Sequence, residues 1–253
     1  MPPFVSLSMP EAIWCAIVVF AAACIRGFSG FGFTAILMTG LTTTLPITQI
    51  VPLSIALEVA ASAGQSPSIL RDVNWRKLGI LLVAGFAGTP LGVFLLGAFS
   101  DQFLRAIVLI CIFTSSVYLI RSRRPPVRFA IITYACAGFA IGVINGATAL
   151  SGLVLALFFS LSGDQPAQIR ATMIAYLFAA DIWAGGMLLT SGFYDGTTLA
   201  RVLLSLPILS LGIWLGSRQF TSVTPDNFKK FVLWLLLALS SSSLILFLAQ
   251  TIV

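Results

Sequence analysis

The 253-residue sequence has no histidine, and only 9% of its side chains are charged. Globular soluble domains contain about 25% charged residues, so a soluble fold is excluded. The absence of histidine removes the usual base of a serine hydrolase and the zinc ligands of an H-E-x-x-H metalloprotease. A glycine-rich Walker loop for a nucleotide is also absent.

One serine motif still raises the question of enzymatic activity. Gly27-Phe28-Ser29-Gly30 matches the G-x-S-G sequence of rhomboid-type intramembrane serine proteases. Those enzymes pair the serine with a histidine, and a lysine base would have to lie at membrane depth. All of the lysines adjoin loops instead: Lys77, Lys229 and Lys230. The sequence therefore predicts a protein that is not an enzyme and that uses no cofactor or metal.

The four cysteines lie in apolar runs without the spacing of a metal or redox site, and we interpret them as reduced packing residues. They are Cys15, Cys24, Cys111 and Cys136. The net charge of +6 could suggest nucleic-acid binding. Basic loops in so apolar a chain ordinarily set membrane topology, so nucleic acid is not an expected partner.

Apolar residues are what the sequence has in abundance. They make up 58% of the chain, and the mean hydropathy is +1.05. The apolar runs approach the 20 or so residues that a helix needs to cross a bilayer. No basic region precedes the first run, so we expect no cleavable signal peptide. These features predict an all-α polytopic protein of the cell inner (plasma) membrane, surrounded by lipid.

Two of the apolar runs are interrupted by polar residues and glycines. The run Ile13 to Ile25 is followed by Arg26 and three glycines before apolar sequence resumes. The run Phe129 to Val143 is interrupted from Asn145 and resumes at Leu153 to Leu161. Each interior glycine costs a helix about 0.5–1 kcal/mol, and an arginine at bilayer depth costs roughly 2.5 kcal/mol or more. Two such breaks in corresponding halves indicate a transporter binding site.

The other apolar runs follow the breaks in the same order in both halves. A basic linker, residues 121–128, separates a transmembrane repeat over 1–120 from a second over 129–253. We expect each repeat to contain one broken or re-entrant helical segment and three transmembrane helices. The predicted runs are Gln49 to Gln65, Leu78 to Phe99 and Phe103 to Ile120, then Ile169 to Thr190, Leu199 to Leu215 and Phe228 to Ala249.

Several spacings support the repeat. The distance along the chain from Glu58 to Asp72 equals that from Asp181 to Asp195. A G-x-x-x-G sequence also recurs at corresponding places, at Gly88 and Gly92 and at Gly212 and Gly216. The agreement in sequence order indicates that the halves share one architecture.

The distribution of basic residues predicts that the repeats are inverted. If each broken segment returns to its side of entry, eleven basic residues share one side, and only Arg105 and Arg201 lie on the other, with Arg26 set aside. If each broken segment crosses once, the division is eight to five. The positive-inside rule prefers the first arrangement. It places the basic loops in the cytoplasm, both termini outside, and the repeats in opposite orientations.

Three ionisable residues are predicted to lie within the membrane. We expect Arg26 to face an anionic substrate, while Glu58 or Asp181 exchanges a proton or forms a salt bridge with the arginine. In the alternative interpretation, Arg26 reaches one interface and the acids are neutral packing residues. Glu58 is the preferred proton carrier because its helix face is small and polar. That face comprises Ser54, Glu58, Ala61 and Gln65.

The residues at the breaks also allow two interpretations. They could expose backbone N–H groups and half-helix N-termini to an anion, or they could permit close helix packing. We favour the first at the breaks and packing for the two G-x-x-x-G sequences, whose faces could also form a homodimer. With Arg26, the candidate substrate-binding residues are Gly27, Ser29, Gly30, Gly32, Asn145, Gly146, Thr148, Ser151 and Gly152.

The arrangement resembles the sulfite exporter TauE/SafE family, also called the 4-toluene sulfonate uptake permeases. The resemblance rests on the chain length, the repeated halves, the break Arg26-Gly-Phe-Ser-Gly-Phe-Gly-Phe33 and its counterpart Gly142-Val-Ile-Asn-Gly-Ala147, and on the loop Arg71-Asp-Val-Asn-Trp75. It implies membrane transport of sulfur-containing anions such as sulfite, sulfoacetate or other organosulfonates. This chain has Gly-Phe-Ser-Gly-Phe-Gly where the family commonly has a plain glycine run.

These observations together predict a secondary transporter for a small sulfur-containing anion. Proton coupling is expected, because buried carboxyls respond to whether an anion has engaged Arg26. The alternatives are an anion channel and a membrane sensor subunit that transports nothing.

Overall fold

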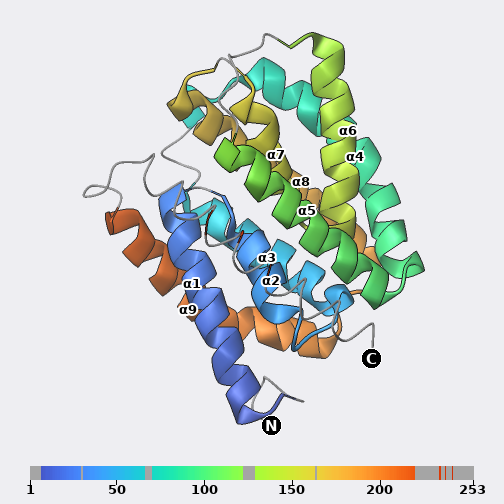
Figure 1. The fold of residues 1–253 in the computed structure, drawn as a ribbon, viewed down its shortest axis with the longest axis vertical. Coiled ribbons are helices and arrows are strands. Elements are labelled where there is room, and N and C mark those ends of the chain that lie inside the picture. The colour runs from blue at the N-terminus through green and yellow to red at the C-terminus, as the bar shows by residue number, and fades with distance from the viewer. Residues whose placement is uncertain are drawn as a thin grey trace.

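In the computed structural model, the described residues are 7–29, 31–65, 70–121, 129–162 and 164–219, with 234, 237 and 241. Over these residues the chain folds into nine α-helices (Figure 1), which confirms the predicted all-α class. The first half contains α1 (Met9–Ser29), α2 (Phe33–Leu41), α3 (Ile47–Gln65), α4 (Trp75–Ala98) and α5 (Asp101–Arg121). The second contains α6 (Ile131–Thr148), α7 (Ser151–Ser160), α8 (Pro166–Thr190) and α9 (Gly196–Gln219).

Six of the described helices are long and apolar enough to cross a membrane: α1, α4, α5, α6, α8 and α9. Their apolar stretches of 18–24 residues correspond to about 27–36 Å, which matches the hydrocarbon core of a bilayer. The protein is therefore a multi-pass membrane protein. The last predicted run, Phe228 to Ala249, lies outside the described residues except for positions 234, 237 and 241, and residues 122–128 of the linker lie outside them entirely.

Both broken segments fold back on themselves. In the first, Trp14 near the start of α1 donates from Nε1 to the carbonyl of Gly40 near the end of α2, at 2.8 Å. In the second, Phe129 just before α6 stacks on Phe158 near the end of α7, with ring centroids 4.9 Å apart. Each short helix thus returns the chain to the end of the segment from which its hairpin began.

The breaks fall later in the sequence than the pattern of residues suggested. Helix α1 continues through Arg26 and Gly27, and the chain turns at Gly32, whose φ of 91° suits a residue without a side chain. Helix α6 likewise continues through Asn145 to Thr148, and it is capped by Ala149, which has a φ of 55°. The helices persist because Gly27 packs against α9 and Arg26 has polar partners inside the protein.

The two halves interlock through their glycines. Helix α1 packs on α9, and α6 packs on α4, as Figure 1 shows. A Cβ atom at Gly212 of α9 would lie 2.5 Å from the Cβ of Ala23 in α1, and one at Gly88 of α4 would collide with the carbonyl oxygen of Phe139 in α6. The packing interpretation of both G-x-x-x-G sequences is confirmed, because the backbones touch where these glycines lie.

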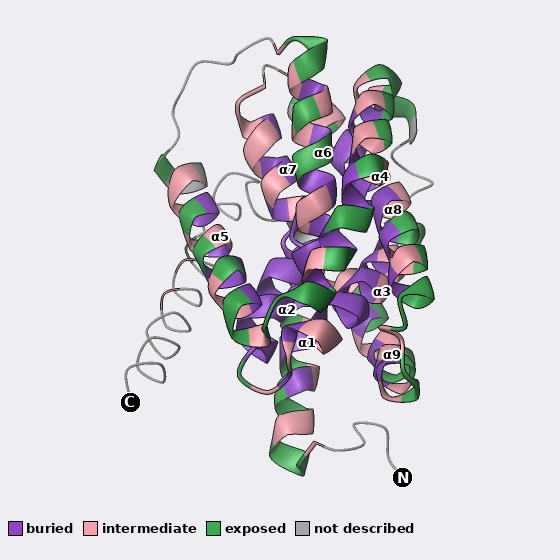
Figure 2. Ribbon diagram, turned by 90° about the vertical axis from the view of Figure 1, so that its right-hand side faces the viewer, coloured by how far each residue is buried: buried purple, intermediate pink, exposed green. Residues whose placement is uncertain are grey.

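The short helix α2 lies at the centre of the packed interior. All nine of its residues are buried, and α3 beside it is largely buried as well (Figure 2). Large apolar side chains are instead exposed on the outer faces of the long helices, for example Phe94 on α4, Ile132 on α6 and Leu203 on α9. This distribution suits a chain whose outer surface faces lipid and whose broken helices are enclosed by protein.

Candidate anion-binding site

A fully buried arginine lies where α1, α2 and α3 meet. Arg26 has 0% of its surface exposed. Its Nε lies 3.0 Å from Oε2 of Glu58 on α3, and its Nη2 donates to the hydroxyl of Ser62, one turn further along α3, at 2.8 Å. Thr34 of α2 donates to the other oxygen of Glu58 at 3.2 Å. Of the two roles considered for Glu58, the structure shows the salt bridge.

The guanidinium of Arg26 is not fully occupied by these contacts. Its Nη1 is buried and has no hydrogen-bond partner among the described residues. A buried ionised donor without an acceptor is costly, so such a group calls for an explanation. An anion that accepted from Nη1 would supply the missing partner.

A second polar pair occupies the corresponding place in the other half. Asn145 lies three residues before the end of α6, as Arg26 does in α1. Its Nδ2 donates to Oδ1 of Asp181 on α8 at 3.0 Å, and both side chains are buried. Asp181 lies within electrostatic range of Glu58 and Arg26, and all four side chains are buried. We call Arg26, Glu58, Asn145 and Asp181 the central cluster.

The two breaks approach each other beside this cluster. A Cβ atom at Gly152, in the first turn of α7, would lie 4.0 Å from the Cβ of Phe31 in the first break. Neither α2 nor α7 has a side chain that caps its first turn. The N–H groups of a first turn have no partner within the helix and carry partial positive charge. No side chain therefore accepts a hydrogen bond from the cap of either short helix.

The remaining candidate residues at the breaks differ in their surroundings. Gly27 faces the carbonyl of Ile213 in α9, and Gly146 faces α4, so both permit close helix packing. The hydroxyl of Thr148 donates to the carbonyl of Ile144 one turn earlier. Ser151 is buried in the first turn of α7. Gly30 and the side chain of Ser29 lie outside the described residues.

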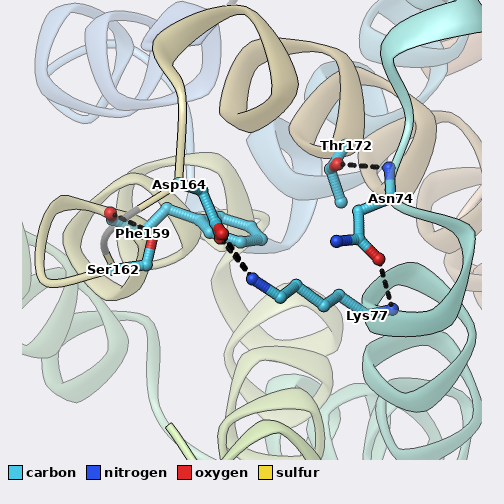
Figure 3. A network of polar contacts seen from close by, with 6 residues as sticks. All are labelled: Asn74, Lys77, Phe159, Ser162, Asp164 and Thr172. Atoms are coloured by element: carbon cyan, nitrogen blue, oxygen red, sulfur yellow. Dashed lines mark hydrogen bonds and ion pairs between the residues drawn. The ribbon is translucent and has the colours of Figure 1, made fainter. Parts of the chain in front are cut away.

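Polar contacts tie the two halves together at one end of the bundle (Figure 3). Lys77, at the start of α4, lies 2.7 Å from Oδ2 of Asp164 in the α7–α8 loop. The backbone N–H of Asn74 donates to the hydroxyl of Thr172 in α8 at 3.1 Å. The ammonium of Lys77 also lies 5.4 Å from the ring centroid of Tyr134 in α6. The first half is thereby held to α6 and α8 of the second.

The opposite end of the bundle has a matching set of ties. Arg201, near the start of α9, donates from Nη1 to Oε1 of Gln49 near the start of α3 at 2.7 Å. The hydroxyl of Tyr194, just before α9, donates to the carbonyl of Pro52 at 2.9 Å. The start of α4 is therefore bound to α8 of the second half, and the start of α9 is bound to α3 of the first half.

Sequence reasoning missed the polar partners of the charged residues. Ser62 lies four residues after Glu58 and so shares its helix face, a spacing that could have identified it. Thr34 belongs to α2, and nothing in the sequence indicated that α2 would lie against Glu58. The pairing of Asn145 with Asp181 depends in the same way on how α6 and α8 pack.

Broken helices around a buried charged cluster, in a protein with several membrane-spanning helices, define a membrane transporter. Residues 15–243 match the family described as Sulfite exporter TauE/SafE, and the chain belongs to this family. It is 26% identical over 188 residues to a Comamonas testosteroni protein described as "Probable inner membrane transporter protein TsaS", across 74% of this chain and 79% of that one. No solved structure matches the chain.

Proposed function

We propose that the protein is a secondary transporter of the inner membrane for a small sulfur-containing oxyanion such as sulfite, sulfoacetate or another organosulfonate. The observation that carries the proposal is the fully buried Arg26 guanidinium, whose Nη1 has no hydrogen-bond partner among the described residues. The family description and the similarity to an inner membrane transporter agree with it.

The donors around Arg26 suit an oxyanion. A guanidinium presents several N–H donors in one plane, and a helix N-terminus adds backbone N–H groups that point along the helix axis. In our proposal, the anion is surrounded by Nη1 of Arg26 and by the first turns of α2 and α7. Helix α2 begins after Gly32, and α7 begins at Ser151. Gly27 and Gly146 contribute by letting the neighbouring helices approach closely.

Coupling to protons follows from the ion pair of Arg26 with Glu58. An anion that draws the guanidinium to itself leaves the Glu58 carboxylate buried without its counter-ion, which is costly at this depth. Uptake of a proton by Glu58 removes that cost. Anion binding and proton uptake therefore favour each other, and a proton gradient can drive accumulation of the anion.

The ties at the two ends of the bundle suit alternating access. Opening one end breaks the Lys77–Asp164 pair, whereas opening the other breaks the Arg201–Gln49 contact. We propose that the repeats are inverted and that the end with Lys77 faces the cytoplasm. The described basic residues support this orientation. On the Lys77 side lie Arg71, Arg76, Lys77, Arg121, Arg170 and Arg218, and on the other side lie Arg105 and Arg201.

The test is uptake of labelled sulfite and sulfonates into vesicles that contain the purified protein. Arg26→Lys keeps the charge but loses the planar donor group, so it should weaken affinity, and Arg26→Ala should weaken it more. Arg105→Ala is the matched control, because it removes an arginine that, among the described residues, pairs with Asp101 near the surface. Saturable uptake that shows counterflow supports a carrier. Unchanged affinity in a folded Arg26→Ala protein excludes the site, and ionic current far above carrier rates indicates a channel.

A further inference from the structure

The Asn145–Asp181 pair contains two buried oxygens with no hydrogen-bond donor. Oδ1 of Asn145 and Oδ2 of Asp181 have no partner in the part of the chain that the structure describes. Asn145 is 0% exposed and Asp181 is 2% exposed, so bulk water does not solvate these atoms. The corresponding carboxylate in the first half, that of Glu58, has the guanidinium of Arg26 beside it. Asp181 has only a neutral amide.

A single proton satisfies both of these atoms. The amide of Asn145 already donates to Oδ1 of Asp181. If Oδ2 of Asp181 is protonated, it becomes a donor, and the carbonyl oxygen of the same amide is an acceptor with no other partner among the described residues. Acid and amide then exchange two hydrogen bonds in a closed ring. Without the proton, two acceptors and a net negative charge are buried together, which is strongly unfavourable.

The surroundings of Asp181 support the neutral form. The charged groups within its electrostatic range are Glu58 on α3 and Arg26 on α1, which already neutralise each other. The other titratable groups near it are Tyr176 on its own helix and Tyr194 in the α8–α9 loop, neither of which is cationic. Asp181 therefore has no cation of its own.

Charge balance in the central cluster then fixes how many protons move. With Arg26 and Glu58 ionised and Asp181 protonated, the anion-free cluster is neutral. A singly charged anion on Arg26 restores neutrality only if Glu58 takes up one proton from solution. Arg170 is half-buried and within range of Arg26, but an arginine keeps its charge with and without the anion, so it does not change the number of protons exchanged. Arg201 lies at the far end of the bundle beside Gln49.

We infer that Asp181 holds a resident proton shared with Asn145, and that Glu58 alone exchanges a proton, so that one proton enters the site with each singly charged anion. The inference rests on the proposed function and specifies its coupling. The proton bonds to Oε2 of Glu58 as the guanidinium leaves that oxygen, and it is released when the anion departs. Transport of a monovalent sulfonate is then electroneutral.

Infrared spectroscopy of the purified protein tests the resident proton without any transport. The wild type at neutral pH and without anion should show one C=O stretching band of a protonated carboxylic acid. Asp181→Asn should lose that band, whereas Glu58→Gln and the exposed control Asp72→Asn should retain it. Loss of the band in Glu58→Gln, or absence of any such band from the wild type, overturns the assignment to Asp181.

Proton uptake on binding tests the stoichiometry. Methanesulfonate and 4-toluenesulfonate are suitable probes because they do not titrate near neutral pH, so any proton taken up binds to the protein. We expect one proton per bound anion in the wild type, with a second carboxylic acid band appearing, and no uptake in Glu58→Gln. Uptake of zero or two protons in the wild type overturns the stoichiometry. If no oxyanion binds at all, the proposed function fails and so does the stoichiometry, while the infrared result still decides the state of Asp181.

Discussion

Replacing Arg26 by alanine should reveal what the buried ion pair contributes to stability. In the wild type, the guanidinium is 0% exposed and the Glu58 side chain 5% exposed, with Nε and Oε2 3.0 Å apart. Removing one partner of such a pair leaves a buried charge without compensation and typically costs about 3–5 kcal/mol. For a chain of this size, each kcal/mol corresponds to roughly 2–4 °C in Tm, so we expect a decrease of about 6–20 °C.

The double variant Arg26→Ala/Glu58→Gln separates the charge from the loss of packing. Glutamine keeps the shape of Glu58 and is neutral, so the double variant should be more stable than Arg26→Ala alone. The single variant should also regain stability as the pH falls, because a proton then neutralises Glu58. Thermal unfolding in detergent, followed by circular dichroism at several pH values, measures both effects. A double variant no more stable than the single one would refute the argument from an uncompensated carboxylate.

Three further outcomes follow from other parts of the structure. Gly142→Leu should destabilise the protein strongly because its side chain would enter the backbone of α4, whereas Gly186→Ala, with open space around it, should be tolerated in the same unfolding assay. Asp195 accepts hydrogen bonds at the start of α9, which lower its pKa to about 2, so its contribution to stability should be present above about pH 4 and be lost as the pH falls toward 2. Lys77→Ala should favour opening of its end of the bundle, measured as faster cysteine labelling there, and the exchange Lys77→Asp with Asp164→Lys should restore the wild-type rate.

Each of these has an outcome that contradicts it. Equal stability of the two glycine variants would mean that α4 and α6 are not in backbone contact. An Asp195→Asn variant whose stability falls between about pH 4 and pH 2 as much as that of the wild type would contradict the role of Asp195, since asparagine does not titrate in this range. Unchanged labelling in Lys77→Ala would show that the ion pair does not hold that end closed.

The sequence was sufficient to predict the fold class, because apolar runs of bilayer length do not depend on tertiary contacts. It also identified Arg26 and Glu58, since charges in so apolar a chain are conspicuous and a salt bridge was one of the two roles considered. The ends of α1 and α6 were predicted less well. Helix propensity disfavours Gly27 within a helix, but its packing against α9 offsets that cost, and α9 begins far away in the sequence.

The partners within the central cluster required the structure. Thr34 reaches Glu58 only because α2 folds back under α1, and Asn145 reaches Asp181 only because α6 packs beside α8. Residue spacing along one helix could indicate Ser62, but no spacing indicates a contact between helices. The same limit applies to Lys77 and Asp164, which come from the start of α4 and from the α7–α8 loop.

The packing of α1 on α9 has a consequence for how the chain is made. Helix α1 is synthesised first, yet the glycines that receive it, Gly212 and Gly216, are among the last described residues to leave the ribosome. Until α9 is inserted, the face of α1 that includes Ala23 has only lipid or the insertion machinery beside it. A chain that stops before α9 therefore leaves this face of α1 uncovered, although α2 and α3 still contact the helix elsewhere. The interface between α1 and α9 can therefore form only after most of the described chain has been synthesised.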